Sequence, residues 1–183
     1  NAQFEEVWNF SEGLAAVKVN GRWGYIGKDG NFTINPQFED TLLFREGMAK
    51  VSLGGKYGFI DKDGKWIANA QFEEVWNFSE GLAAVKLNGK WGYIAKDGKF
   101  IINPQFEFAD SFNEGIARVQ SKGKWGYIEK NGKWVVAVQF DEAAAFSSAA
   151  AKVKLNEKYG FIDRNGNFII KPHFDDVWLF NGE

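Results

Sequence analysis

Residues 82–102 read LAAVKLNGKWGYIAKDGKFII, and this stretch decides the fold. Its apolar and aromatic residues form three short runs, which Asn88-Gly89 and Asp97-Gly98 separate. Asn-Gly favours a two-residue type I′ turn, because both central residues of that turn need a positive φ. The stretch therefore predicts an antiparallel meander of three strands, with the third strand ending before Pro104.

The same phrase returns along the chain at a fixed period. A phenylalanine marks each copy, at Phe4, Phe38, Phe72, Phe106, Phe140 and Phe174. A unit of this length is too small to bury a core alone, so neighbouring units must cover one another. We expect a single repeat domain over residues 1–183, in which both ends look cut from a longer array. Its repeats are 1–34, 35–68, 69–102, 103–136 and 137–170, with a partial copy at 171–183.

The arrangement of the units has two solutions. Each unit also has a leading segment, residues 72–78 in the third copy, which adds at most a short fourth strand to the meander. We expect an all-β fold in which the meanders stack as an open β array or solenoid. The alternative is a five-bladed, propeller-like ring, although a repeat of this length is short for a four-stranded blade.

One mid-strand position is glycine in every complete copy, namely Gly24, Gly58, Gly92, Gly126 and Gly160. Glycine weakens a strand unless a neighbouring backbone needs the space, so we expect a close approach between units here. The fifth copy departs from the others, because Ser148-Ala149 replaces a Glu-Gly pair and Asn156-Glu157 replaces a tight turn. This departure predicts a locally altered junction.

The composition excludes several classes of function. The chain is 45% apolar and 17% aromatic, which is ample for a continuous core. Its net charge of −2 gives no basic stripe for a phosphate backbone, so we expect no nucleic-acid partner. The sequence has no cysteine, and no apolar run is long enough for a membrane span. The compartment stays open, with the bacterial cell surface or extracellular space favoured over the cytoplasm.

Three passages of the third copy carry a family resemblance: residues 78–83 (FSEGLA), 89–94 (GKWGYI) and 97–99 (DGK). They resemble the bacterial WG repeats, named for their Trp-Gly pair. Tyr57 and Tyr159 replace the tryptophan in two copies but keep an aromatic residue before the glycine. The resemblance implies a β-rich tandem module, commonly an interaction or scaffold region, and it transfers no catalytic residue.

Polar residues give no sign of a catalytic or metal site. A uniform repeat offers the same groups at every step, whereas catalysis needs groups in unlike roles. We therefore expect no catalytic residue, no cofactor and no metal, and we interpret the single histidine, His173, as a surface or turn residue. Turn hydrogen bonding explains the aspartates before glycine, Asp29, Asp63 and Asp97, better than calcium binding does. It also explains the acids after each phenylalanine better than a glycosidase pair does: Glu5, Glu39, Glu73, Glu107, Asp141 and Asp175.

The leading segments supply a candidate interaction surface of aromatic residues: Trp8, Phe10, Trp76, Phe78, Trp178 and Phe180. These rings either stack within the core or form shelves for sugar rings. We therefore expect a non-enzymatic scaffold that binds a protein partner or further copies of itself. The alternative is a carbohydrate- or cell-wall-binding module, and an enzyme with an unfamiliar site ranks last.

Overall fold

The computed structural model describes residues 4–147 and 149–176, and it contains two compact units, Asn1–Pro104 and Gln105–Glu183. The described residues form strands, turns and loops, and no helix that could cross a membrane occurs among them. The expected all-β fold is confirmed.

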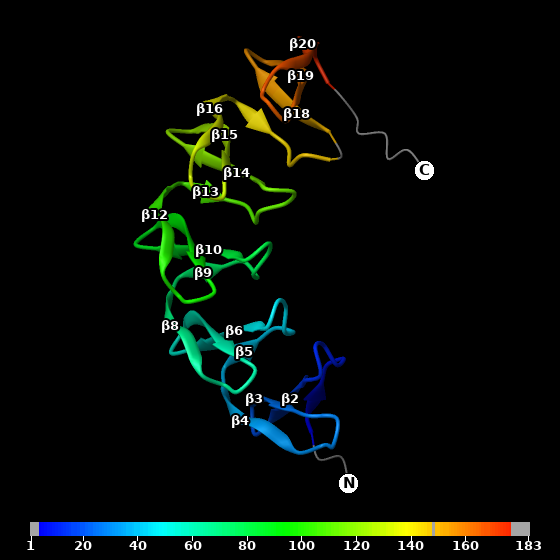
Figure 1. Ribbon diagram of the computed structural model, residues 1–183, viewed down its shortest axis with the longest axis vertical. Coiled ribbons are helices and arrows are strands. Elements are labelled where there is room, and N and C mark those ends of the chain that lie inside the picture. The colour runs from blue at the N-terminus through cyan, green and yellow to red at the C-terminus, as the bar shows by residue number, and fades with distance from the viewer. Residues whose placement is uncertain (1–3, 148, 177–183) are drawn as a thin grey trace. The chain divides into compact units, whose positions relative to one another are not determined.

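The strands form five antiparallel sheets, each of which follows the chain order without a crossover (Figure 1). Sheet one holds β1 (Glu6–Val7), β2 (Ala15–Val19), β3 (Arg22–Ile26) and β4 (Phe32–Phe38). Sheet two holds β5 (Asp40–Thr41), β6 (Met48–Leu53), β7 (Lys56–Asp61) and β8 (Trp66–Phe72). Sheet three holds β9 (Glu74–Val75), β10 (Leu82–Leu87), β11 (Lys90–Ala95) and β12 (Phe100–Phe106). Sheet four holds β13 (Phe108–Ala109), β14 (Ile116–Ser121), β15 (Lys124–Glu129) and β16 (Trp134–Phe140). Sheet five holds β17 (Glu142–Ala143), β18 (Ala150–Leu155), β19 (Lys158–Asp163) and β20 (Phe168–Phe174).

The predicted central hairpin is confirmed in register and in turn type. In sheet three, Leu87 pairs with Lys90 across the turn, and Val85 faces Gly92 in the middle of the ladder. Asn88 and Gly89 both have positive φ, at 52° and 73°, as a type I′ turn requires.

Each sheet has four strands rather than the three of the predicted meander. In sheet three, the leading segment pairs Val75 with Val85 and Glu74 with Lys86. This first strand is only two residues long, and the hairpin turns are equally short, so four strands fit within one repeat. Repeat length is therefore no argument against a propeller blade.

The fourth strand of each sheet also runs further than expected. In sheet one it passes through Pro36 and ends at Phe38. The register shifts there, because Trp23 pairs with Phe38 while Tyr25 pairs with Ile34. An edge strand with a bulge tolerates proline, since the missing N–H breaks no ladder hydrogen bond.

This bulge explains the constant mid-strand glycine. A Cβ at Gly24 would lie 2.5 Å from the Ile34 carbonyl oxygen and 2.6 Å from the Pro36 nitrogen. The expected close approach between units was therefore wrong: the contact joins two neighbouring strands of one sheet. The same contact recurs at Gly58, Gly92, Gly126 and Gly160.

The core lies between the sheets and uses the small, branched and aromatic residues of the two central strands. Ala15 and Val17 are fully buried in one cluster, and Tyr25 and Trp23 are buried in another. The expected departure in the fifth copy is not seen at its hairpin turn, because Asn156 and Glu157 keep positive φ values of 51° and 63°. Glu157 thus adopts the left-handed backbone conformation that a glycine adopts at the same position in the other four sheets.

Candidate functional site

The acid that follows each repeat phenylalanine binds the hairpin turn of its own sheet. The Glu73 carboxylate accepts a hydrogen bond from the Gly89 amide at 3.0 Å, and Glu39 does the same for Gly55 at 2.9 Å. Glu5, Glu107 and Asp141 cap their turns in the same way, and Asp175 contacts Lys158 instead. The turn hydrogen bonding predicted for all six acids is therefore confirmed for five of them.

A second tight turn precedes the first long strand of each sheet, and sequence reasoning missed it. Glu12 and Gly13 both have positive φ, at 51° and 92°, and the Ser11 amide donates to the Leu14 carbonyl at 2.9 Å. Glutamate is uncommon in this left-handed region, so the pair does not resemble a type I′ turn in sequence. The glycine that recurs directly after the glutamate is the signal that could have identified it.

The glutamates of these turns clamp one sheet to the next. The Glu12 carboxylate accepts a hydrogen bond from the Gly47 amide at 2.9 Å and lies 3.1 Å from the Lys62 ammonium. Glu46 repeats this in the next sheet, accepting from the Gly81 amide at 2.9 Å and pairing with Lys96 at 3.1 Å. The clamp therefore recurs with the repeat.

Both clamp glutamates in the first unit have a lowered pKa. Partial burial acts to raise the pKa of Glu12, but the hydrogen bonds from Lys62 and the Gly47 amide outweigh it. The pKa of Glu46 is lowered for the same reason. Partial burial acts to raise this pKa, but the hydrogen bonds from Lys96 and the Gly81 amide outweigh the effect of burial. The folded state therefore favours the ionised carboxylates.

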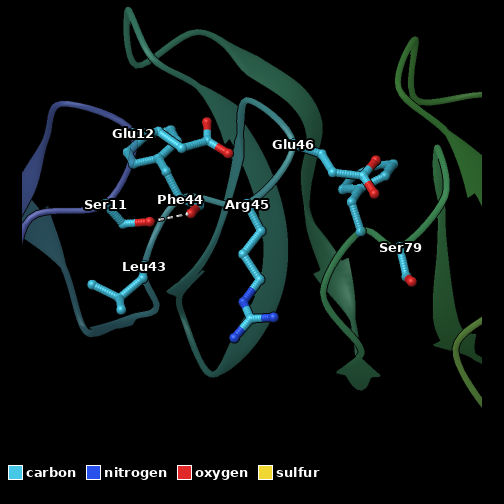
Figure 2. Close-up of a pocket in the computed structure, with 8 residues that line it drawn as sticks. Ser11, Glu12, Leu43, Phe44, Arg45, Glu46 and Ser79 are labelled. Carbon is cyan, nitrogen blue, oxygen red and sulfur yellow. Dashed lines mark hydrogen bonds between the residues drawn. The ribbon is translucent and has the colours of Figure 1, made fainter.

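An open pocket of about 390 Å³ lies beside these turns in the first unit, lined by Ser11, Glu12, Leu43, Phe44, Arg45, Glu46, Phe78 and Ser79. Figure 2 shows the Ser11 hydroxyl donating to the Phe44 carbonyl and the Arg45 side chain extending away from both carboxylates. The clamps engage both carboxylates of this pocket, Glu12 through the Gly47 amide and Glu46 through the Gly81 amide.

The second unit has the corresponding pair, in which Arg164 binds both the Glu114 carboxylate and the Glu114 carbonyl. The Arg164 guanidinium also lies over the Phe146 ring, 5.4 Å from its centroid. A pocket of about 420 Å³ beside this pair includes Trp134. The clamp thus tolerates arginine in place of lysine.

The predicted aromatic surface divides between exposed and buried rings. Trp76 is 42% exposed and stacks on Trp91 with a centroid separation of 5.9 Å and an interplanar angle of 10°. Trp8 packs against the core and meets Trp23 edge to face at 5.2 Å. Trp76 and Trp8 therefore each pack against the tryptophan of the Trp-Gly pair in their own sheet.

The phenylalanines of that surface lie in different environments. Phe10 is 50% exposed, whereas Phe78 is buried at 4% exposure and packs edge to face on Phe59. Of the two alternatives for these rings, Phe78 therefore follows stacking within the core, whereas Phe10 remains exposed. Trp178 and Phe180 lie outside the described residues.

The remaining polar candidates are local. The Nδ1 atom of His173 lies 2.7 Å from the Lys171 carbonyl oxygen, and the imidazole packs on Phe174. Asp29 accepts hydrogen bonds from the Asn31 amide and side chain, which is turn chemistry. Within residues 4–147 and 149–176, no group of three or more His, Cys, Asp or Glu side chains could hold a metal ion.

Successive sheets meet through one recurring pair of aromatic rings. The last residue of a sheet, such as Phe38, meets the first residue of the next sheet's fourth strand, Trp66, edge to face at 5.9 Å. The same arrangement joins Phe72 to Phe100 at 6.3 Å, Phe106 to Trp134 at 6.0 Å and Phe140 to Phe168 at 6.3 Å. Each of these contacts covers the phenylalanine at the end of one sheet's fourth strand with a ring from the next sheet.

The fifth sheet is the exception. Phe38, Phe72, Phe106 and Phe140 are 1 to 3% exposed, but their counterpart Phe174 is 37% exposed. Ile170 is 38% exposed, whereas its counterparts Ile34, Ala68, Ile102 and Val136 are buried. We call Ile170 and Phe174 the terminal face. Both residues of this face are apolar.

Comparison with known proteins identifies the repeat. The profile described as "WG containing repeat" matches residues 1–23, 23–57, 57–91, 91–125, 125–159 and 159–183. A search of curated protein sequences gives no match.

Solved structures share the fold at low sequence identity. A eukaryotic initiation factor is 11% identical with a TM-score of 0.57, over 90% of this chain and 53% of its own. Hsv2 of Kluyveromyces lactis is 9% identical with a TM-score of 0.51, over 90% of this chain and 63% of its own. The chain therefore spans less than two thirds of these structures. The Hsv2 structures are propeller-like, and at this identity the likeness concerns the fold alone.

Proposed function

The chain belongs to the family of WG containing repeats, and from this premise we propose that it is a non-enzymatic scaffold that binds protein surfaces or further copies of itself. Its sheets provide a rigid support, because rings and clamps lock neighbouring sheets together within each unit. The working surface is the terminal face.

The observation that carries this proposal is the difference between equivalent residues. Phe174 and Ile170 occupy positions that are buried in every earlier sheet, yet they are more than one third exposed. Because about a third of each side chain remains exposed, burying that third is worth roughly 0.5–1 kcal/mol each, which favours association. The partner is therefore an apolar or aromatic protein surface.

We propose the open array as the arrangement of the sheets and keep the five-bladed ring as the alternative. The likeness to propeller-like structures supports the ring as the alternative arrangement.

A variant of the terminal face tests the proposal. Ile170→Thr with Phe174→Ser removes apolar surface without touching the internal interfaces. We expect the parent chain to associate with protein surfaces, seen as a rise in molar mass by light scattering, and the variant to remain monomeric with an unchanged melting temperature. A parent chain that stays monomeric and binds no protein partner would contradict the proposal.

Trp76 supports carbohydrate binding as a second candidate function. Its ring is exposed and is held flat against Trp91, and exposed rings of this kind can stack on sugars. Pull-down with insoluble peptidoglycan or chitin tests it. Binding that Trp76→Ala abolishes, in a chain that remains folded, would favour this function over the scaffold.

A further inference from the structure

The pocket of about 420 Å³ in the second unit is built by sheets four and five, each of which has all four strands. Sheet four contributes the Glu114 turn and the start of β16, and sheet five contributes Arg164 and Asn165. The volume lies in the range of small-ligand sites. The pocket therefore belongs to an internal junction of the chain and has room for a small ligand.

One wall of the pocket is the indole ring of Trp134, which is 40% exposed. Phe106 meets this ring edge to face at 6.0 Å, which fixes its orientation. Trp66, the counterpart in sheet two, is half-buried and lies against a glycine of its own sheet, because a Cβ at Gly58 would be 2.7 Å from Trp66 Cζ3. At Gly126 in sheet four, the three nearest atoms are all backbone atoms. The Trp134 ring thus lies differently from Trp66 and presents more of its surface to the pocket.

Three polar side chains around this ring have hydrogen-bonding capacity to spare. Among residues 4–147 and 149–176, the Lys133 ammonium and the Asn165 carboxamide have no hydrogen-bond or ion-pair partner. The Glu129 carboxylate accepts one long hydrogen bond, from the Asn131 side chain at 3.3 Å. The pocket therefore offers a donor, an acceptor and an amide that is both.

The charges of the lining balance one another. Glu114 and Glu129 are acidic, and Lys133 and Arg164 are basic, so the pocket has two side chains of each sign. Arg164 is already bound to the Glu114 carboxylate and carbonyl. Neither a phosphate group nor a cationic ligand finds an unbalanced charge here. The lining therefore suits an uncharged polar ligand.

A pyranose sugar has the chemistry that matches this lining. Its ring presents a face of C–H groups, which packs on an indole, and a rim of hydroxyl groups, which both donate and accept hydrogen bonds. In β-1,4-linked glucose and N-acetylglucosamine, the substituents of the ring are equatorial, so both faces of the sugar are flat and apolar. Such a ring uses the flat Trp134 wall and the polar rim together.

We propose that this pocket binds an uncharged, β-1,4-linked oligosaccharide, with one pyranose ring stacked on Trp134 and its hydroxyl groups bound by Glu129, Lys133 and Asn165. The site goes beyond the scaffold function and does not use the terminal face. It is also separate from the exposed Trp76 ring, which belongs to the first unit. The scaffold thereby holds a glycan and a protein on different surfaces.

Isothermal titration calorimetry with cellohexaose and chitohexaose tests the site. The two probes share the β-1,4 linkage and distinguish a chain of glucose from a chain of N-acetylglucosamine. We expect the parent chain to bind at least one of them with a dissociation constant below about 1 mM. No binding of either probe at this level would overturn the proposal.

The repeat supplies variants that should leave the fold intact, because the new residues already stand at equivalent positions in other sheets. Lys133→Asn and Trp134→Phe introduce the residues found at Asn31 and Phe100, and Glu129→Ala introduces the residue found at Ala95. The Lys133→Asn, Trp134→Phe double variant should raise the dissociation constant at least about fivefold, since it shrinks the stacking ring and removes a donor. Glu129→Ala should raise it at least about threefold through the lost acceptor. An unchanged dissociation constant in either variant would contradict the assigned site.

The matched control makes the same changes in sheet two. Lys65→Asn with Trp66→Phe should leave the dissociation constant unchanged, and an equal loss of affinity there would refute the assignment to sheet four. Binding that Trp76→Ala abolishes, while the sheet-four variants retain it, would also overturn the proposal in favour of the Trp76 ring.

Light scattering separates this inference from the scaffold function. The sheet-four variants should have the same molar mass as the parent chain at every concentration, because none of these changes alters Ile170 or Phe174. Failure of sugar binding therefore leaves the scaffold untouched, and failure of association leaves the sugar site untouched.

Discussion

At the residue scale, the constant glycines show what a sequence repeat can and cannot specify. Their recurrence predicted that something packs against a bare Cα, and the structure confirms the crowding at Gly24 and its counterparts. The recurrence of the glycine does not show which backbone segment approaches it, because that depends on the bulge near Pro36 in the neighbouring strand. The tight contact holds one sheet together rather than joining sheets.

Gly24→Ala tests this contact. The added methyl would meet the Ile34 carbonyl oxygen at 2.5 Å, so we expect the free energy of unfolding to fall by about 1–3 kcal/mol. Gly27→Ala is the matched control, because the repeat counterpart Ala95 already carries that side chain. Urea unfolding of both variants measures the difference. Equal effects would contradict the assigned contact.

Glu157 is a second residue-scale test, because it holds a φ of 63° where Gly89 and Gly123 stand in other sheets. Glu157→Gly should raise the free energy of unfolding of the second unit by about 1 kcal/mol, since glycine adopts this conformation without steric cost. The lost ion pair with Lys154, at 3.5 Å and exposed, contributes little. Thermal unfolding that shows a lower melting temperature would refute this explanation.

At the element scale, the position of a sheet in the series decides what its phenylalanine does. Phe140 and Phe174 end β16 and β20 and occupy the same repeat position, but only Phe140 is covered by another sheet. Phe140→Ala should lower the free energy of unfolding by about 3–5 kcal/mol, as for a buried ring. Phe174→Ala should cost less than about 1 kcal/mol when measured in dilute solution. Similar losses would mean that Phe174 is covered too.

The glutamate clamps predict an acid-sensitive junction between sheets. The pKa of Glu46 is lowered from 4.5 in the folded state, so its contribution is complete above pH 4.5 and is lost as the pH falls through the folded-state pKa. Glu46→Gln should therefore reduce the loss of stability between neutral pH and pH 3. Glu74→Gln, which alters an exposed acid within one sheet, is the control. The measurement is urea unfolding across this pH range.

How much of each element could be predicted depends on the range of the interaction. The Asn88-Gly89 turn and its hairpin follow from local backbone preferences, and both were predicted. The sequence does not decide whether Glu74–Val75 forms a strand, because two residues are too few to show an alternation of apolar and polar side chains. The Glu12-Gly13 turn was missed, since its unusual glutamate is held by contacts to the next sheet.

At the scale of the whole molecule, the sequence identified a repeat scaffold but not the surface it offers. Periodicity shows that units must cover one another, and the family match confirms the repeat. Phe140 and Phe174 occupy equivalent positions in the repeat, so the sequence alone does not show that the first is buried and the second exposed. The sequence left open which rings of the aromatic set are buried, because the burial of Phe78 and the exposure of Phe10 depend on packing between segments.

The most direct test of the account is the molar mass of the chain, measured by light scattering over a wide range of protein concentration. If the exposed side chains of Phe174 and Ile170 bind a second copy of the chain, the measured molar mass should rise above the 20.6 kDa of one chain as the concentration increases. The Ile170→Thr, Phe174→Ser variant should stay at that value. A parent chain that remains at 20.6 kDa at every concentration would contradict self-association through Ile170 and Phe174.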